Sequence, residues 1–395
     1  MTGFKDKSVN LIEVNLNINF HLKLFTFLSF FLITQGFAQF QIPQGKPDFL
    51  LEKFRFEENN NGVEDYILSA SQARIFNKEK IYVLDSAIGE ILKDKSHYFI
   101  NGEKAIYNQG KHEVFFPGKC QVNNKKSLFL LASTLTIQLN NKILQSQDKV
   151  TMKGREQGKI FDIKANAFNF NLEKKEFELL KGVNAKIHNK KEAFKINIQS
   201  RKAHVIEKKL ITITFDKKVN IKSHLFSSQA DKVIAIYQKG KKHINKITFF
   251  AHPKKTLKLK YQNNSISARQ ATLVFKDSKT ISEFIASDNV TLNTVDKNKN
   301  PITLNSTQLS LNKNIITAKG PNTQIKFNNY TAISPHVEFD KLTQDIRFIG
   351  PSTINDNQGQ TLSGDQMRYD GKTQLIHIKK TKGRIKKQII LEQTN

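Results

Sequence analysis

Residues Ile160–Ile187 read IFDIKANAFNFNLEKKEFELLKGVNAKI, and the architecture of the whole chain follows from this segment. In it apolar residues alternate with Lys, Asn, Asp and Glu, and a strand ending in Ala165 is followed by a polar turn and a strand that begins at Gly182. A period of two places the apolar side chains on one face of a β-strand. The stretch therefore predicts about three to four short antiparallel strands.

The same phrase recurs along the chain. Equivalent valines at 150, 183, 219 and 290 are separated by 33, 36 and 71 residues, and the last interval corresponds to two units. Clear copies are Leu128–Met152, Phe194–Ile221 and Ser265–Leu292, and looser copies begin near Ile67, Tyr98, Leu225, Ile302, Tyr330 and Gln360. Repeats of such lengths stack on one another. We therefore expect about ten repeats of roughly 30 to 36 residues.

These repeats predict an all-β protein. Helical repeats would need stretches of about 10 to 15 residues with apolar spacings of three and four, which the chain lacks. A propeller blade has a comparable length, but its common Trp-Asp signature is missing because the chain has no Trp. The remaining architecture is an elongated sandwich or half-open roll with an apolar interior along its whole length.

Composition narrows the class of protein further. Of 395 residues 38% are hydrophobic, which is too many for a disordered chain, and the length suffices for one large core or several smaller ones. One cysteine, Cys120, excludes an internal disulfide and a four-thiolate metal site. The net charge of +28 comes mostly from lysine, which suits a diffuse polyanionic surface or serves solubility and edge protection.

The N-terminus reads as a targeting segment. Leu24–Ile33, LFTFLSFFLI, is an apolar run of about signal-peptide length, preceded by Lys23 and followed by the small residues Gly36 and Ala38. We expect residues 1–38 to be a signal peptide cleaved after Ala38, and the protein to reach the periplasm. The alternative is an uncleaved inner-membrane anchor. Association of the exported protein with the inner or the outer membrane stays open at this point.

The repeated phrase resembles the OstA-like, or organic solvent tolerance-like, family of periplasmic lipopolysaccharide-transport proteins. It has a small residue at a strand end, an apolar residue five to seven positions later, and a strand with valine after Gly or Asp. The small residues are Ala70, Ala132, Ala165, Ala268 and Gly364, the apolar ones are Phe76, Leu139, Phe170, Phe275 and Tyr369, and the valines are Val183 and Val290. Residues 50–125 look like the inner-membrane-associated component, and residues 126–390 look like the soluble bridge component.

The resemblance implies a twisted, open β-jellyroll that shields acyl chains in a longitudinal groove and joins other envelope lipid-transport proteins through its edge strands. It implies lipopolysaccharide or a related amphiphile as cargo and no enzymatic activity. One departure is that Gly-Asn-Val, usual before the last strand of a unit, reads Gln147-Asp148-Lys149-Val150 here. Another is that ten units exceed a single bridge protomer, which suggests a fused or prolonged version.

Alternation selects the side chains that should face such a groove. In Phe168-Asn169-Phe170-Asn171-Leu172 the aromatic rings fall on one face and the amides on the other. Acyl chains that bury against this face gain about 0.8 kcal/mol per CH₂. The groove candidates are Phe129, Leu139, Phe161, Phe168, Phe170, Phe177, Phe275 and Phe284.

Catalytic and metal-binding motifs are missing from the sequence. It has no G-x-S-x-G, no Gly-rich phosphate loop and no H-E-x-x-H, so we expect no catalytic residue, cofactor or metal. Export and the lack of an aromatic-basic motif argue against nucleic acid as a partner. The rival hypothesis is a structural β-scaffold or surface adhesin with a closed core and no lipid cargo.

Overall fold

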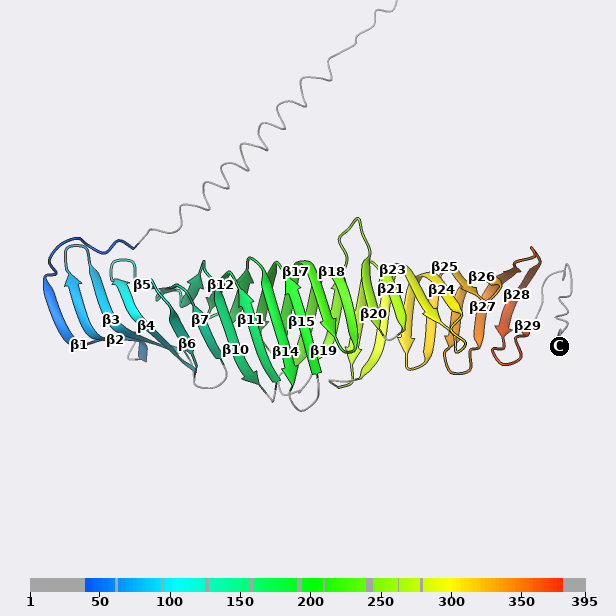
Figure 1. Ribbon diagram of the computed structural model, residues 1–395, viewed down its shortest axis with the longest axis horizontal. Coiled ribbons are helices and arrows are strands. Elements are labelled where there is room, and N and C mark those ends of the chain that lie inside the picture. Colours follow the sequence, from blue (N-terminus) through cyan, green and yellow to red (C-terminus); the bar gives the residue numbers. More distant parts are fainter. Residues whose placement is uncertain are drawn as a thin grey trace, which may run out of the picture. The chain divides into compact units, whose positions relative to one another are not determined.

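The computed structural model describes residues 40–60, 63–93, 96–124, 128–156, 159–189, 194–208, 210–238, 244–261, 263–277 and 280–378. From Pro47 onward the chain forms one compact unit. Its regular elements, within the described residues, are 29 strands, all paired antiparallel and following one another along the unit (Figure 1). The predicted signal peptide, residues 1–38, lies outside the described residues. No described helix is long and apolar enough to cross a membrane.

The strands form two hydrogen-bonded ladders, which long strands join by contributing one half to each. These long strands are β1 (Phe49–Asn60), β2 (Val63–Phe76), β3 (Ile81–Lys93), β4 (Ser96–Asn108), β17 (Leu210–Ser223), β18 (Phe226–Gln238), β23 (Ile281–Val295), β24 (Pro301–Asn312), β25 (Ile315–Phe327), β26 (Tyr330–Asp340), β27 (Ile346–Asp356) and β28 (Thr361–Tyr369).

The other strands belong to one ladder each. Ladder 1 contains β6 (Cys120–Asn123), β7 (Leu128–Ala132), β10 (Val150–Glu156), β11 (Lys159–Ala165), β14 (Val183–Asn189), β15 (Phe194–Ser200), β20 (Leu257–Tyr261) and β21 (Asn264–Ala268). Ladder 2 contains β5 (Glu113–Phe116), β8 (Leu135–Gln138), β9 (Ile143–Ser146), β12 (Ala167–Asn171), β13 (Glu176–Leu180), β16 (Lys202–Glu207), β19 (Ile244–Phe250), β22 (Gln270–Phe275) and β29 (Ile376–Ile378).

A line of sharp bends, which we call the spine, joins the ladders where the chain passes from one to the other. In β17 the bend is a bulge between Asp216 and Val219, with Lys217 and Lys218 at positive φ. Bulges bend a strand and increase its twist. Buried serines satisfy the disrupted backbone at later bends, where the Ser334 hydroxyl donates to the His336 carbonyl at 2.9 Å.

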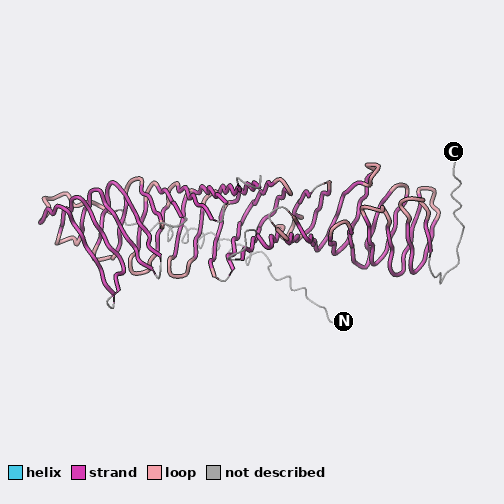
Figure 2. The backbone as a smooth tube through the Cα atoms, turned by 90° about the horizontal axis from the view of Figure 1, so that it is seen from below, coloured by secondary structure: helices cyan, strands magenta, loops and turns pink. Residues whose placement is uncertain are grey.

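The turns of ladder 2 recur with one geometry, visible among the loops between strands in Figure 2. Lys80, His112, Lys142 and Lys175 each occupy the last position of a turn with φ between 49° and 55°. Successive turns are hydrogen-bonded, because the Gln109 amide donates to the Lys80 carbonyl at 2.9 Å and the next turns repeat this bond. The same turn therefore recurs from Lys80 to Lys175 along ladder 2.

Apolar side chains from both ladders meet in one continuous core. It runs from Phe54 to Tyr369 and includes the small residues Ala132, Ala165 and Ala268. The strands bury alternate residues, as in β8 and β9, because successive side chains point to opposite faces of a strand. The expectation of an all-β, elongated jellyroll-like fold is confirmed.

Candidate functional site: the interior and its mouth

The side of the unit opposite the spine, which we call the mouth, lies between the hairpin turns of the two ladders. Polar contacts cross it at several points. Near the first strands, the Lys142 ammonium of a ladder 2 turn pairs with the Asp65 carboxylate at 2.5 Å. Farther along, the Lys297 amide donates to Gln344 Oε1 at 3.3 Å and Asn328 Nδ2 donates to the Tyr369 hydroxyl at 2.9 Å.

Aromatic side chains bridge the interior from one ladder to the other. Tyr98 of ladder 1 meets Phe170 of ladder 2 edge-on, with ring centroids 5.9 Å apart. Phe226 meets Phe249 in the same way at 5.8 Å. Such pairs stabilise each other beyond their buried area, by roughly 0.5–1.5 kcal/mol. Aromatic side chains from both ladders therefore close the interior.

Seven of the eight groove candidates share this interior. Leu139, Phe168, Phe177, Phe275 and Phe284 are buried, and Phe161 and Phe170 are partly buried against the core. Phe129 differs, because its neighbours Leu130 and Ala132 are buried while Leu131 is exposed. Phe129 therefore lies on the outer face of ladder 1, and the proposal of lipid contact depends on the other seven.

Two glycines position rings of the interior and were not singled out from the sequence. A Cβ on Gly154 would lie 1.9 Å from Cζ of Phe161, its cross-strand partner. A Cβ on Gly102 would lie 2.5 Å from Cδ1 of Phe116. Both rings lie over a bare backbone, as aromatic residues do opposite glycine in sheets. A glycine inside a stretch with strand periodicity is the sequence signal that could have identified these two positions.

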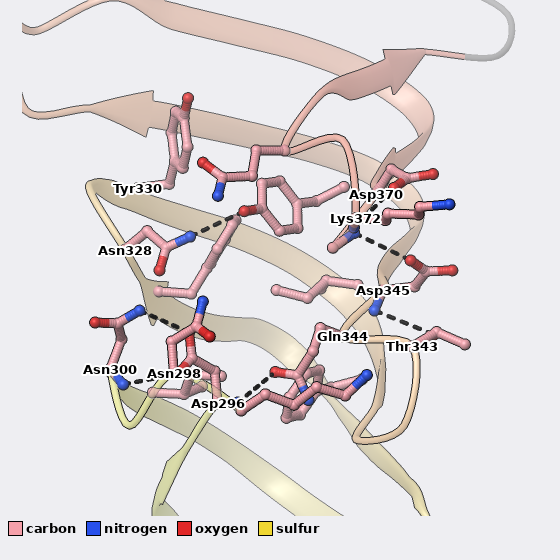
Figure 3. A pocket seen from close by; sticks show the side chains of 18 of the residues that line it. Asp296, Asn298, Asn300, Asn328, Tyr330, Thr343, Gln344, Asp345, Asp370 and Lys372 are labelled. Carbon is pink, nitrogen blue, oxygen red and sulfur yellow. Dashed lines mark hydrogen bonds between the residues drawn. The ribbon is translucent and has the colours of Figure 1, made fainter. Parts of the chain in front are cut away.

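A cavity of about 920 Å³ opens at the mouth near the last strands (Figure 3). Its floor includes Phe327, Phe339 and Tyr369, and turns of both ladders form its polar rim. Arg368 of this rim pairs with Asp345 at 2.6 Å. The cavity thus combines an aromatic floor with charged walls, as an amphiphile requires.

A second opening of about 460 Å³ lies at the mouth near the middle of the chain. Phe226 and Tyr261 contribute from ladder 1, and Thr280 and Ile281 from the opposite turn of ladder 2. Phe226 is also one of the bridging rings, so this opening leads directly to the aromatic interior.

Buried tyrosines give the mouth a pH dependence. Burial raises the pKa of Tyr66, and the hydrogen bond that its hydroxyl donates to Glu58 raises that pKa further. Burial also raises the pKa of Tyr107. The hydroxyl groups of the two tyrosines lie 3.2 Å apart. Above pH 10 the unfolded phenols ionise while the folded ones keep their protons, so the folded state loses stability as pH rises.

We expect alkaline unfolding to begin above about pH 10, with phenolate absorbance at 295 nm appearing together with unfolding. Phenolate absorbance that reaches its full value while circular dichroism stays native would contradict this burial.

Groups that could carry other chemistry are few in the described residues. No cluster of three or more His, Cys, Asp or Glu side chains could hold a metal among them. Cys120 is buried in β6, and burial raises the pKa of its thiol to about 12. The interior and its mouth therefore offer an apolar space with a polar rim to a bound molecule.

Comparison with known proteins identifies the stretch that carries the resemblance. Residues 24–189 match the family model described as LptC, lipopolysaccharide-assembly, LptC-related. A matching solved structure is that of LptH from Pseudomonas aeruginosa, described as the LptA homologous periplasmic component of the conserved lipopolysaccharide transport device. The identity is 14% and the TM-score 0.26, and the match covers 31% of this chain and 85% of that chain. No curated protein matches the chain.

Proposed function

We propose, starting from the LptC-related character of residues 24–189, that this chain is a non-enzymatic lipopolysaccharide-transport protein of the periplasm. Its cargo would lie with the acyl chains between the two ladders and the saccharide at the mouth. The observation that carries this proposal is the continuous apolar interior from Phe54 to Tyr369, which is lined on one side by polar turns.

Loading requires the ladders to part at the mouth. The bridging rings close the interior, so acyl chains must replace contacts such as that of Phe226 with Phe249. Each buried CH₂ contributes about 0.8 kcal/mol, so several acyl chains together outweigh a few ring pairs of roughly 1 kcal/mol each. The bends of the spine would serve as the hinge.

Edge strands supply the second part of the proposal. In the described residues β1 pairs only with β2, and Phe49, Leu50 and Leu51 of this edge are exposed. A free edge can add a strand from another protein. We propose that the chain joins other envelope lipid-transport proteins through such edges and so bridges the inner to the outer membrane.

The division at residue 125 stays a prediction. Cys120 of β6 pairs with Ala132 of β7, so the ladder continues across this position.

The rival hypothesis of a structural scaffold draws support from the ring pairs that close the interior.

Binding of lipopolysaccharide to the purified protein at low and at high salt tests the proposal. Salt screens coulombic attraction but leaves acyl burial in place. We expect binding to persist at high salt. Binding that vanishes at high salt would reduce the interaction to basic residues touching headgroups, and no binding at either salt would favour the scaffold.

A further inference from the structure

A row of residues on the outer face of ladder 1, which we call the lysine track, runs from strand to strand, from the middle of β10 and β14 to the mouth-side ends of β17 and β20. Each member pairs directly with the next on the neighbouring strand, so all of them share one face of the ladder. In order along the ladder the members are Lys153, Asp162, Lys186, Asn197, Lys222, Ser227 and Lys260. Alternation places this face opposite to the interior, as buried Ala185 beside exposed Lys186 shows.

The track places one lysine on every second strand. With strands about 4.8 Å apart, successive ammonium groups repeat at roughly 10 Å. All four lysines are exposed, and Asp162 is the single acid of the track. The outer face of ladder 2 is different over the same strands, because acids balance its lysines and Lys202 pairs with Glu178 at 2.9 Å.

The end of the track at β17, β18 and β20 reaches the mouth. Lys222 and Lys260 each lie one residue from the end of their strand on the mouth side. Lys260 and Ser227 line the same opening as the interior rings Phe226 and Tyr261. A polar groove of about 370 Å³ contains Lys186, Asn197 and Lys222.

Asn197 lies in the middle of the track and carries an unused acceptor. Its Oδ1 atom is buried and has no hydrogen-bond partner among the described residues. A carbonyl oxygen between two ammonium groups suits a ligand that brings a hydroxyl donor together with negative charge. A phosphorylated saccharide has both.

We propose that the lysine track holds the phosphorylated saccharide headgroup of the amphiphile whose acyl chains lie between the ladders. This inference rests on the proposed function. The phosphates contact the lysines on the outer face of ladder 1. The acyl chains pass around the mouth-side edge of ladder 1 into the interior. The track then orients each molecule with its headgroup toward ladder 1, and its repeat offers successive positions along the chain.

The test compares two triple variants of the full chain with the same loss of charge. One is Lys186→Gln, Lys222→Gln and Lys260→Gln in the track. The matched control is Lys232→Gln, Lys246→Gln and Lys319→Gln, three exposed lysines on the outer face of ladder 2. The probes are diphosphoryl lipid A and its dephosphorylated form with the same acyl chains, each at low salt.

We expect the track variant to bind diphosphoryl lipid A about tenfold more weakly than the parent, since it loses three exposed charge contacts with the phosphates and keeps the acyl contacts. Its binding of the dephosphorylated form and both affinities of the control should stay unchanged. Equal weakening in the two variants, or a track variant that binds like the parent, would overturn the lysine track and leave the proposed function standing. A parent that binds neither probe would overturn the proposed function, and the track with it.

Discussion

Phe284→Ala is expected to lower the free energy of unfolding by about 3–5 kcal/mol, the usual cost of removing a fully buried aromatic ring. Phe284 lies in β23 with none of its side chain exposed, and its cross-strand partners are Leu273 and Leu311. Its removal leaves a cavity in a core that both ladders share, so the loss includes transfer and cavity contributions.

The matched control is Phe129→Ala, because Phe129 lies on the outer face of ladder 1. A surface substitution of this kind changes stability by about 0.5 kcal/mol or less. Chemical denaturation followed by circular dichroism measures both variants. Equal losses at the two positions would contradict the register that buries Leu130 and Ala132 and turns Phe129 outward.

The phenylalanines show how much of the fold could be predicted from the sequence. Alternation identified the strands around Phe168 and Phe170, because a strand that is half buried must alternate. The small residues at strand ends, such as Ala132 and Ala165, also proved to be buried. Local periodicity is sufficient for these features, since each depends only on the strand to which it belongs.

The orientation of Phe129, in contrast, could not be predicted from alternation. The run Leu128-Phe129-Leu130-Leu131-Ala132 is apolar at every position, so alternation cannot decide which face is buried. The pairing of β7 with β6 and β10 decides it. A one-residue shift in register would exchange the two faces, and only the neighbouring strands fix that register.

The mouth and the lysine track could not be predicted for a related reason. Lys153 and Lys260 are more than a hundred residues apart in sequence and share a row only because six direct strand pairings connect them. Likewise, the contact of Lys142 with Asp65 joins a turn of ladder 2 to strand β2, 77 residues away in the sequence. The lysines of the track stand singly within their strands, so no local motif marks them in the sequence.

The central claim is that acyl chains occupy the interior between the ladders. The chain has no Trp, so a single introduced tryptophan is the sole indole reporter. Phe170→Trp places it inside, where the native ring meets Tyr98 and Phe177, and Phe129→Trp places it on the outer face. Both native rings are partly exposed, which leaves room for the larger indole.

The most direct measurement is quenching of these two tryptophans by lipopolysaccharide brominated on its acyl chains, because bromine quenches an indole only at close range. We expect Phe170→Trp to lose most of its emission on loading and Phe129→Trp to keep its emission. Circular dichroism should confirm that both variants fold like the parent. Quenching of Phe129→Trp alone, or of neither tryptophan with lipid demonstrably bound, would contradict the claim that the interior carries the acyl chains.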